Sequence, residues 1–180
     1  PKNFHKPYLE QSTRPGQIKG LHRKIIKNMA QHPDLPILVA FDTFTAHNDR
    51  HPGNLMYDEK SDHYFAIDME CTFNHNIAQY AYALFKRMIQ GKENEARLST
   101  EEINALAVYQ STLKKLIAMY PPDVIFAKIT KARCDAGIKD HEESAETEKV
   151  GRQIIQDNYN SCKQVVAILN ILFKIYDPQL

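Results

Sequence analysis

A polar loop near position 50 carries side chains whose oxygen atoms suit the chemistry of phosphate transfer. Asp49 lies five residues before Asn54, and a Pro-Gly bend between them can fold the loop back on itself. Asp68 follows at the end of a short apolar segment. Carboxylate and carboxamide oxygens are the ligands that Mg²⁺ prefers, and the cation usually takes one or two of them from protein. These residues therefore predict a metal site, with an acid nearby to orient or deprotonate an attacking hydroxyl.

The approach of Asn54 to Asp68 depends on the segment between them, which is predicted to be a β-hairpin. Short apolar strands at Leu55–Tyr57 and Tyr64–Ile67 flank the polar turn DEKSD. If the hairpin turns about Ser61, Asn54 faces Asp68 across the strands, with their backbones about 5 Å apart. In this register the two oxygen-bearing side chains point at one place.

Two other interpretations of the loop stay open. A zinc or iron hydrolase site is one, because histidine and carboxylate ligands suit those metals. Its ligands would be His47, Asp49, His51 and Asp68, and it leaves Asn54 and the hairpin without an explanation. The other is a polar turn with an aspartate cap, although such turns seldom lie between a buried helix and a strand that ends in aspartate.

The elements that must position the loop are mostly helical. Apolar residues recur at helical spacing from Gln17 to Gln31, after an irregular opening, and predict a first helix. The segment from Leu35 to His47 is apolar nearly all round, so it should be buried on several sides and support the loop rigidly. Ser99 and Glu102 form a capping-box pattern. Further helices are expected at residues 77–89, 100–119, 122–133 and 147–176.

Composition limits the class of protein. The 180 residues suffice for one domain with a real core. Apolar residues make up 43% and charged residues 25%, with a net charge of +1, so neither nucleic acid nor a membrane surface is expected as a partner. No apolar run approaches the roughly 20 residues of a transmembrane segment.

The expected location is cytoplasmic, either in the producing cell or in a host cell. The polar start PKNFHKPYLEQ lacks the apolar core of a signal peptide. The three cysteines are Cys71, Cys134 and Cys162, and their wide spacing indicates neither a disulfide framework nor a zinc site. A reducing compartment fits this pattern best.

The run DRHPGN at residues 49–54, followed by the predicted hairpin and Ile67-Asp68, resembles two kinase families. It is similar to the catalytic loop and metal-binding segment shared by phosphoinositide 3- and 4-kinases and HipA-like bacterial serine/threonine kinases. The preceding AHN and the buried helix ahead of it are closer to the HipA-like kinases. The resemblance covers residues 38–73.

By that resemblance Asp49 is the catalytic aspartate, Asn54 and Asp68 bind ATP through magnesium, and Arg50 is mainly a structural brace. In the lipid kinases His51 would carry more of the base role. The implied fold is mainly α with a short β-hairpin, an α+β domain equivalent to the large C-terminal lobe of a protein kinase. One domain, 1–180, would hold a catalytic loop at 47–54, a metal-binding hairpin at 55–70 and a helical remainder at 76–176.

The sequence departs from complete kinases in one respect. The residues before Leu35 include neither a glycine-rich loop nor a lysine-bearing strand like those that grip ATP phosphates. The small lobe is thus expected to be missing, supplied by another chain, or lost in a degenerate kinase.

The substrate is expected to be a protein hydroxyl rather than a lipid headgroup. After Asp68 the chain has no lysine or arginine until Lys86, whereas phosphoinositide kinases usually offer basic residues there to the inositol phosphates. A lipid kinase stays an alternative. So does a non-catalytic binding module that keeps the loop for its fold.

Overall fold

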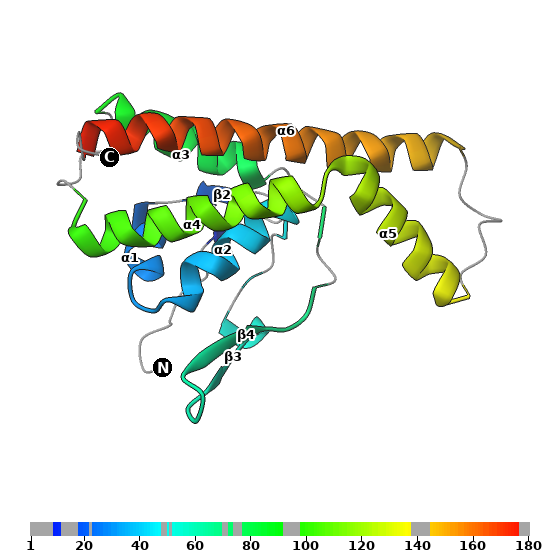
Figure 1. Cartoon of the computed structure of the whole chain (residues 1–180), viewed down its shortest axis with the longest axis horizontal. Coiled ribbons are helices and arrows are strands. Elements are labelled where there is room, and N and C mark those ends of the chain that lie inside the picture. Colours follow the sequence, from blue (N-terminus) through cyan, green and yellow to red (C-terminus); the bar gives the residue numbers. More distant parts are fainter. Residues whose placement is uncertain are drawn as a thin grey trace.

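The computed structural model describes residues 9–11, 18–21, 23–47, 50, 52–69, 72–73, 77–91, 98–137 and 145–176. These residues are mainly helical, with two antiparallel strand pairs (Figure 1). The helices are α1 (Arg23–Met29), α2 (Asp34–Phe44), α3 (Ile77–Ile89), α4 (Thr100–Met119), α5 (Pro122–Asp135) and α6 (Ala145–Tyr176). The strands are β1 (Leu9–Gln11), β2 (Ile18–Leu21), β3 (Leu55–Asp58) and β4 (His63–Ala66), and a 3₁₀ turn at Pro52–Asn54 precedes β3.

The four later helices are confirmed, and their bounds agree with the predictions to within two residues at each end. The capping box at the start of α4 is also confirmed. The Glu102 backbone N–H donates to Ser99 Oγ at 3.3 Å, and the Ser99 N–H donates back to Glu102 Oε2 at 2.9 Å. Two donors that the first helical turn leaves without partners are thereby satisfied.

The first helix was predicted too long. Ile18–Leu21 forms β2, which pairs with β1, and helix α1 begins only at Arg23. Gly20 disfavours a helix at this point by about 1 kcal/mol relative to alanine. The pairing partner, Leu9–Gln11, lies in the segment predicted to be irregular, so local periodicity could not reveal it. The rest of that opening, residues 1–8 and 12–17, lies outside the described residues.

The β3–β4 hairpin is confirmed, but its predicted register is wrong by one residue. Met56 pairs with Phe65 and Tyr57 with Tyr64, and the Ile67 N–H donates to the Asn54 carbonyl at 3.0 Å. Asn54 therefore lies opposite Ile67 and not opposite Asp68.

The turn explains the shift in register. It spans four residues between Asp58 and His63, where symmetry about Ser61 would require five. The Asp58 carboxylate accepts from the Lys60 N–H at 3.0 Å and from Ser61 Oγ at 2.7 Å. Asp62 has a φ of 55°, in the left-handed region that aspartate tolerates better than most residues. These local hydrogen bonds close the turn one residue early.

Helix α2 lies at the centre of the fold, in contact with α1, α3, α4, α6 and β4. Burial on several sides is thus confirmed, although Ile37 and Phe41 stay exposed. The long helix α6 packs against α3 and α4, and the hairpin extends below these helices in the view of Figure 1. Of the helices in the described ranges, none is both long and apolar enough to cross a membrane.

Candidate functional site

The candidate site lies where α2 ends, the polar loop follows and the hairpin begins. Asp49 and His51 lie outside the described residues, so their catalytic roles stay predictions. His47, Arg50, Asn54 and Asp68 are described. These four residues and the groups that hold them define the geometry of the site.

Arg50 makes a two-pronged ion pair with Asp42 of α2. Its Nε donates to Asp42 Oδ2 at 3.1 Å, and its Nη2 donates to Oδ1 at 3.0 Å. The Arg50 side chain is fully buried, and Asp42 is nearly so. Such a planar fork fixes both the position and the orientation of the guanidinium. The loop is thus attached to α2 at its centre.

The remaining donors of Arg50 hold the two segments that carry Asn54 and Asp68. Nη1 donates to the Asn54 carbonyl at 2.9 Å and to the Ile67 carbonyl at 2.7 Å. The Ile67 carbonyl belongs to the peptide bond that leads into Asp68. One guanidinium therefore joins α2, the 3₁₀ turn and the end of β4, and it fixes the backbone at both predicted metal-binding positions.

The Asp42 carboxylate is affected by burial and by its partner in opposite directions. Burial raises the pKa of Asp42 to about 6, although the Arg50 hydrogen bonds and charge act to lower it. A pKa near 6 leaves the carboxylate ionised at neutral pH, so the ion pair is intact there. Removing either partner would leave a buried charge uncompensated, at a cost of about 3–5 kcal/mol.

Asn54 and Asp68 differ in their surroundings. Asn54 is buried, with 6% of its surface exposed, whereas Asp68 is exposed. The corrected register places Asp68 one step beyond the residue opposite Asn54, and the strand alternation ends there because Asp68 has a φ of 56°. The structure therefore brings the two backbones together, although not through the direct pairing that was predicted.

Backbone strain gathers around this loop. Ala46, Asp68 and Phe73 all have φ between 51° and 56°, in the left-handed region that costs a non-glycine residue about 1–3 kcal/mol. Aspartate is found in this region more often than most residues, whereas alanine and phenylalanine are not. The Phe73 N–H donates to the Thr45 carbonyl at 2.8 Å, so the segment after Asp68 is tied back to the start of the loop. Strain of this kind is typical of functional sites.

One face of the hairpin presents a patch of large apolar side chains to solvent. The exposed fractions are 57% for Met56, 51% for Phe65 and 39% for Ile67. Met56 and Phe65 are cross-strand neighbours, and Ile67 is two residues beyond Phe65 on the same face. This hairpin patch was missed from the sequence. Its signal was a run of apolar residues on both faces of a two-stranded hairpin, which has only one face to bury.

The opposite face of the hairpin is anchored to the corner between α1 and α2. The Tyr64 N–H donates to Asp34 Oδ2 at 2.9 Å, and the Tyr57 hydroxyl donates to Asp62 Oδ1 at 2.6 Å. The His32 ring packs edge-on against Tyr64, with centroids 4.9 Å apart. The hydrogen bond to Asp62 raises the pKa of Tyr57 to about 12, so this hydroxyl stays protonated as the donor.

The hydrolase interpretation finds no support among the described residues. No group of three or more His, Cys, Asp or Glu residues in those ranges is arranged to hold a metal ion. Two of the four ligands of that interpretation, Asp49 and His51, lie outside them. Cys162 is buried, and burial raises the pKa of its thiol to about 12, so it is inert as a nucleophile.

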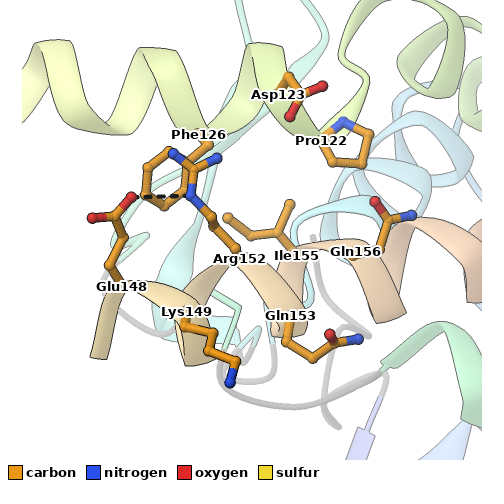
Figure 2. A pocket seen from close by; sticks show the side chains of 9 residues that line it. All are labelled: Pro122, Asp123, Phe126, Glu148, Lys149, Arg152, Gln153, Ile155 and Gln156. Carbon is orange, nitrogen blue, oxygen red and sulfur yellow. Dashed lines mark hydrogen bonds and ion pairs between the residues drawn. The ribbon is translucent and has the colours of Figure 1, made fainter. Parts of the chain in front are cut away.

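A pocket of about 480 Å³ opens between α5 and α6 and is lined by residues of these two helices (Figure 2). The Arg152 guanidinium lies 3.6 Å from the centre of the Phe126 ring, and its Nε donates to Glu148 Oε1 at 3.0 Å. Both charged side chains are about half exposed. None of the polar side chains that line the pocket is buried, so the pocket has no buried polar group to recognise a ligand.

No family model, no curated protein and no solved structure matches this chain. The structure therefore defines the class through its architecture, which is mainly helical with antiparallel strand pairs.

Proposed function

We propose that this chain is the large lobe of a protein-kinase-like phosphotransferase, of the HipA-like kind, which transfers the γ-phosphoryl group of ATP to a protein hydroxyl. The observation that supports this most is the set of hydrogen bonds that Arg50 donates. A buried guanidinium, ion-paired to a central helix, holds the backbones at Asn54 and Asp68 beside each other. Such a costly arrangement is typical of a site that must keep its ligands in one geometry.

The donor set fits magnesium bound together with a triphosphate. Asn54 and Asp68 supply two oxygen ligands, which is the number that Mg²⁺ usually takes from protein in such sites. Asp68 is exposed, so water and phosphate oxygens have access to the remaining coordination positions. Bound magnesium would offset charge on the phosphates, while the chain keeps the two ligands in position through Arg50.

The hairpin patch suits the base of the nucleotide. Met56, Phe65 and Ile67 offer a flat apolar surface that begins within two residues of both Asn54 and Asp68. A nucleotide has the matching layout, with an aromatic base at one end and metal-bound phosphates at the other. Ligand sites typically combine an apolar lining with a few polar groups in this way. The patch would then be covered by the base and by whatever encloses it.

Asp49 would act on the attacking hydroxyl. It immediately precedes Arg50, whose fork with Asp42 restricts where the loop can run. Its proposed role is to accept the hydroxyl proton or to orient the hydroxyl. If the substrate is a lipid, His51 would share this role with Asp49. A protein substrate stays the first choice because no lysine or arginine occurs between Asp68 and Lys86.

A non-catalytic binding module is the second candidate. The expected lack of a lysine in any strand before Leu35 is wrong, because Lys19 lies in β2, so it no longer counts for this candidate. What favours the module is that Arg50 donates to Asp42 and to backbone carbonyls, contacts that serve folding without any catalysis. Such a module would keep Arg50 and its partners for folding alone. It would then tolerate changes at Asp68, whose side chain is exposed.

The test is phosphoryl transfer by the Asp68→Asn variant of the natural protein that contains this chain. The amide keeps the size of the carboxylate but removes its charge, so turnover should fall about 100-fold or more while the melting temperature stays unchanged. Asp123→Asn is the matched control, because it makes the same change at an exposed aspartate of α5, away from the hairpin. Turnover of Asp68→Asn at the wild-type rate would reject Asp68 as a magnesium ligand. No phosphoryl transfer by the wild type would reject the kinase proposal in favour of the binding module.

A further inference from the structure

The C-terminal end of α2 is held by side chains from two helices far away in the sequence. Asn158 of α6 donates from Nδ2 to the Phe44 carbonyl at 2.7 Å and to the Thr43 carbonyl at 3.4 Å. Tyr109 of α4 donates to Thr43 Oγ1 at 3.1 Å. The last carbonyls of a helix have no partners within it, and a buried end must find them elsewhere. Asn158 supplies the donor that water supplies to an exposed helix end.

Asn158 is poorly suited to a purely stabilising role. It is 2% exposed, and its buried Oδ1 atom has no hydrogen-bond partner among the residues that the structure describes. An unsatisfied buried acceptor is unfavourable, and it offsets much of what the hydrogen bond to Phe44 contributes. A partly satisfied amide at such a position therefore adds little net stability. Its contribution is to position, because its hydrogen bonds to the Thr43 and Phe44 carbonyls fix where the end of α2 lies.

The carbonyls that Asn158 holds are next to Asp42, the residue that binds Arg50. Asp42, Thr43 and Phe44 are consecutive in the last turn of α2. The chain then reverses through Ala46, with a φ of 51°, and the His47 N–H donates to the Asp42 carbonyl at 2.9 Å. A shift of this turn would move the Asp42 carboxylate and the exit of the loop together.

We propose that Asn158 is a positioning residue for the loop that follows α2, and that it acts through the Thr43 and Phe44 carbonyls on the fork between Asp42 and Arg50. Its effect on turnover rests on the proposed function. Its effect on the order of the loop does not.

The experiment compares Asn158→Leu with a matched control, Gln110→Leu. Gln110 is also a buried amide, and it donates to the Val166 carbonyl at 3.1 Å and to Asn170 Oδ1 at 2.9 Å, both on α6. Neither hydrogen bond involves α2. Both substitutions replace a buried amide with a side chain of similar size, so they separate an effect on the loop from general destabilisation.

The readout is the Arg50 Nε–H resonance in NMR spectra, since this proton lies in the fork with Asp42. In Asn158→Leu its exchange with solvent should accelerate about tenfold, whereas Gln110→Leu should leave it at the wild-type rate even if its melting temperature falls. Asn158→Gln keeps the amide donor and should restore part of the protection. In the enzyme, Asn158→Leu should lower kcat about 10- to 100-fold with little change in the KM for ATP.

Three results would overturn the proposal. The first is wild-type protection of Arg50 Nε–H in Asn158→Leu. The second is a loss of protection in Gln110→Leu equal to that in Asn158→Leu. The third applies if Asn158→Leu fails to fold, and it is a folded Asn158→Gln variant in which Arg50 Nε–H is not protected. Absence of phosphoryl transfer in the wild type would reject the kinase function alone, because the exchange measurement needs no activity.

Discussion

The helical layer of α3 and α6 and the region around the β3–β4 hairpin are held in place by different interactions. Where α3 meets α6, the buried side chains are almost all apolar, among them Leu84, Phe85, Val165 and Leu169. At the hairpin, large apolar side chains are exposed and a charged side chain is buried. Met56 and Phe65 are exposed, and a buried arginine holds the backbone.

This difference separates stability from function. Apolar packing adds stability roughly in proportion to the buried area and tolerates changes that conserve volume. A buried ion pair adds little net stability, and a hydrophobic replacement of both partners often performs as well. Arg50 and Asp42 are therefore better explained by the position that they impose than by the stability that they provide.

Breaking the fork should have the largest effect on folding. Arg50→Met removes the guanidinium and leaves Asp42 buried without its partner, so the free energy of unfolding should fall by about 3–5 kcal/mol. The double variant Asp42→Leu/Arg50→Met should recover most of the lost free energy of unfolding. The hairpin should be disordered in both variants, because neither has the guanidinium that holds its backbone. Denaturant unfolding measures the first effect, and NMR of the residues in β3 and β4 measures the second. If the double variant is as unstable as Arg50→Met, the ion pair between Asp42 and Arg50 contributes net stability in addition to fixing position.

In the helical layer, volume should matter more than chemistry. Leu169 is fully buried, and Leu169→Ala should lower the free energy of unfolding by about 2–5 kcal/mol. Leu169→Met conserves volume and should cost less than about 1.5 kcal/mol. Thermal melts measure both. Neither variant should change the exchange of Arg50 Nε–H, and a change there would mean that the two regions are not independent.

A fall in pH through about 6 should change the contribution of Asp42 to stability and the order of the loop in opposite directions. Because the folded-state pKa of Asp42 is raised to about 6, its protonation favours the folded state, and this contribution is lost as the pH rises through about 6. The fork needs the ionised carboxylate, so protection of Arg50 Nε–H should fall as the pH drops below about 6. Asp34, Asp58 and Asp62 have lowered pKa values, and their stabilising contributions are lost only at lower pH.

This prediction is checked by subtracting the unfolding free energies of Asp42→Asn from those of the wild type between pH 7 and 5. The difference should change with pH in the direction given by the raised pKa. A flat difference would place the pKa of Asp42 near its ordinary value.

The smallest effect on stability is expected at the hairpin patch. Phe65→Ala removes an exposed side chain, so the melting temperature should hardly change. If the patch receives the nucleotide base, affinity for Mg-ATP should fall about tenfold, which corresponds to roughly 1.4 kcal/mol. Calorimetry on the natural protein measures this affinity. Tyr80→Ala is the control, because it removes an exposed aromatic side chain from α3. Equal affinities of both variants would exclude the patch from the site.

The sequence by itself determined the features that depend on neighbours along the chain. Helices α3 to α6 were predicted close to their observed bounds, the Ser99 and Glu102 pattern predicted a cap, and the polar turn between two apolar runs predicted a hairpin. The position of the loop after a buried helix also followed from local composition. In each case the physical cause, a helical period or a side-chain bond to a nearby backbone, acts over a few residues.

Only the tertiary structure decided the rest, because the partners are distant or the alternatives differ by one residue. The pairing of β2 with β1 replaced a helical turn that local spacing favoured. The hairpin register depended on hydrogen bonds of Asp58 within the turn, and a slip of one residue moved Asn54 away from Asp68. Asn158 meets Phe44 across 114 positions, and Arg50 reaches the Ile67 carbonyl across 17. Contacts of this kind depend on the packing of whole helices, which local sequence patterns do not encode.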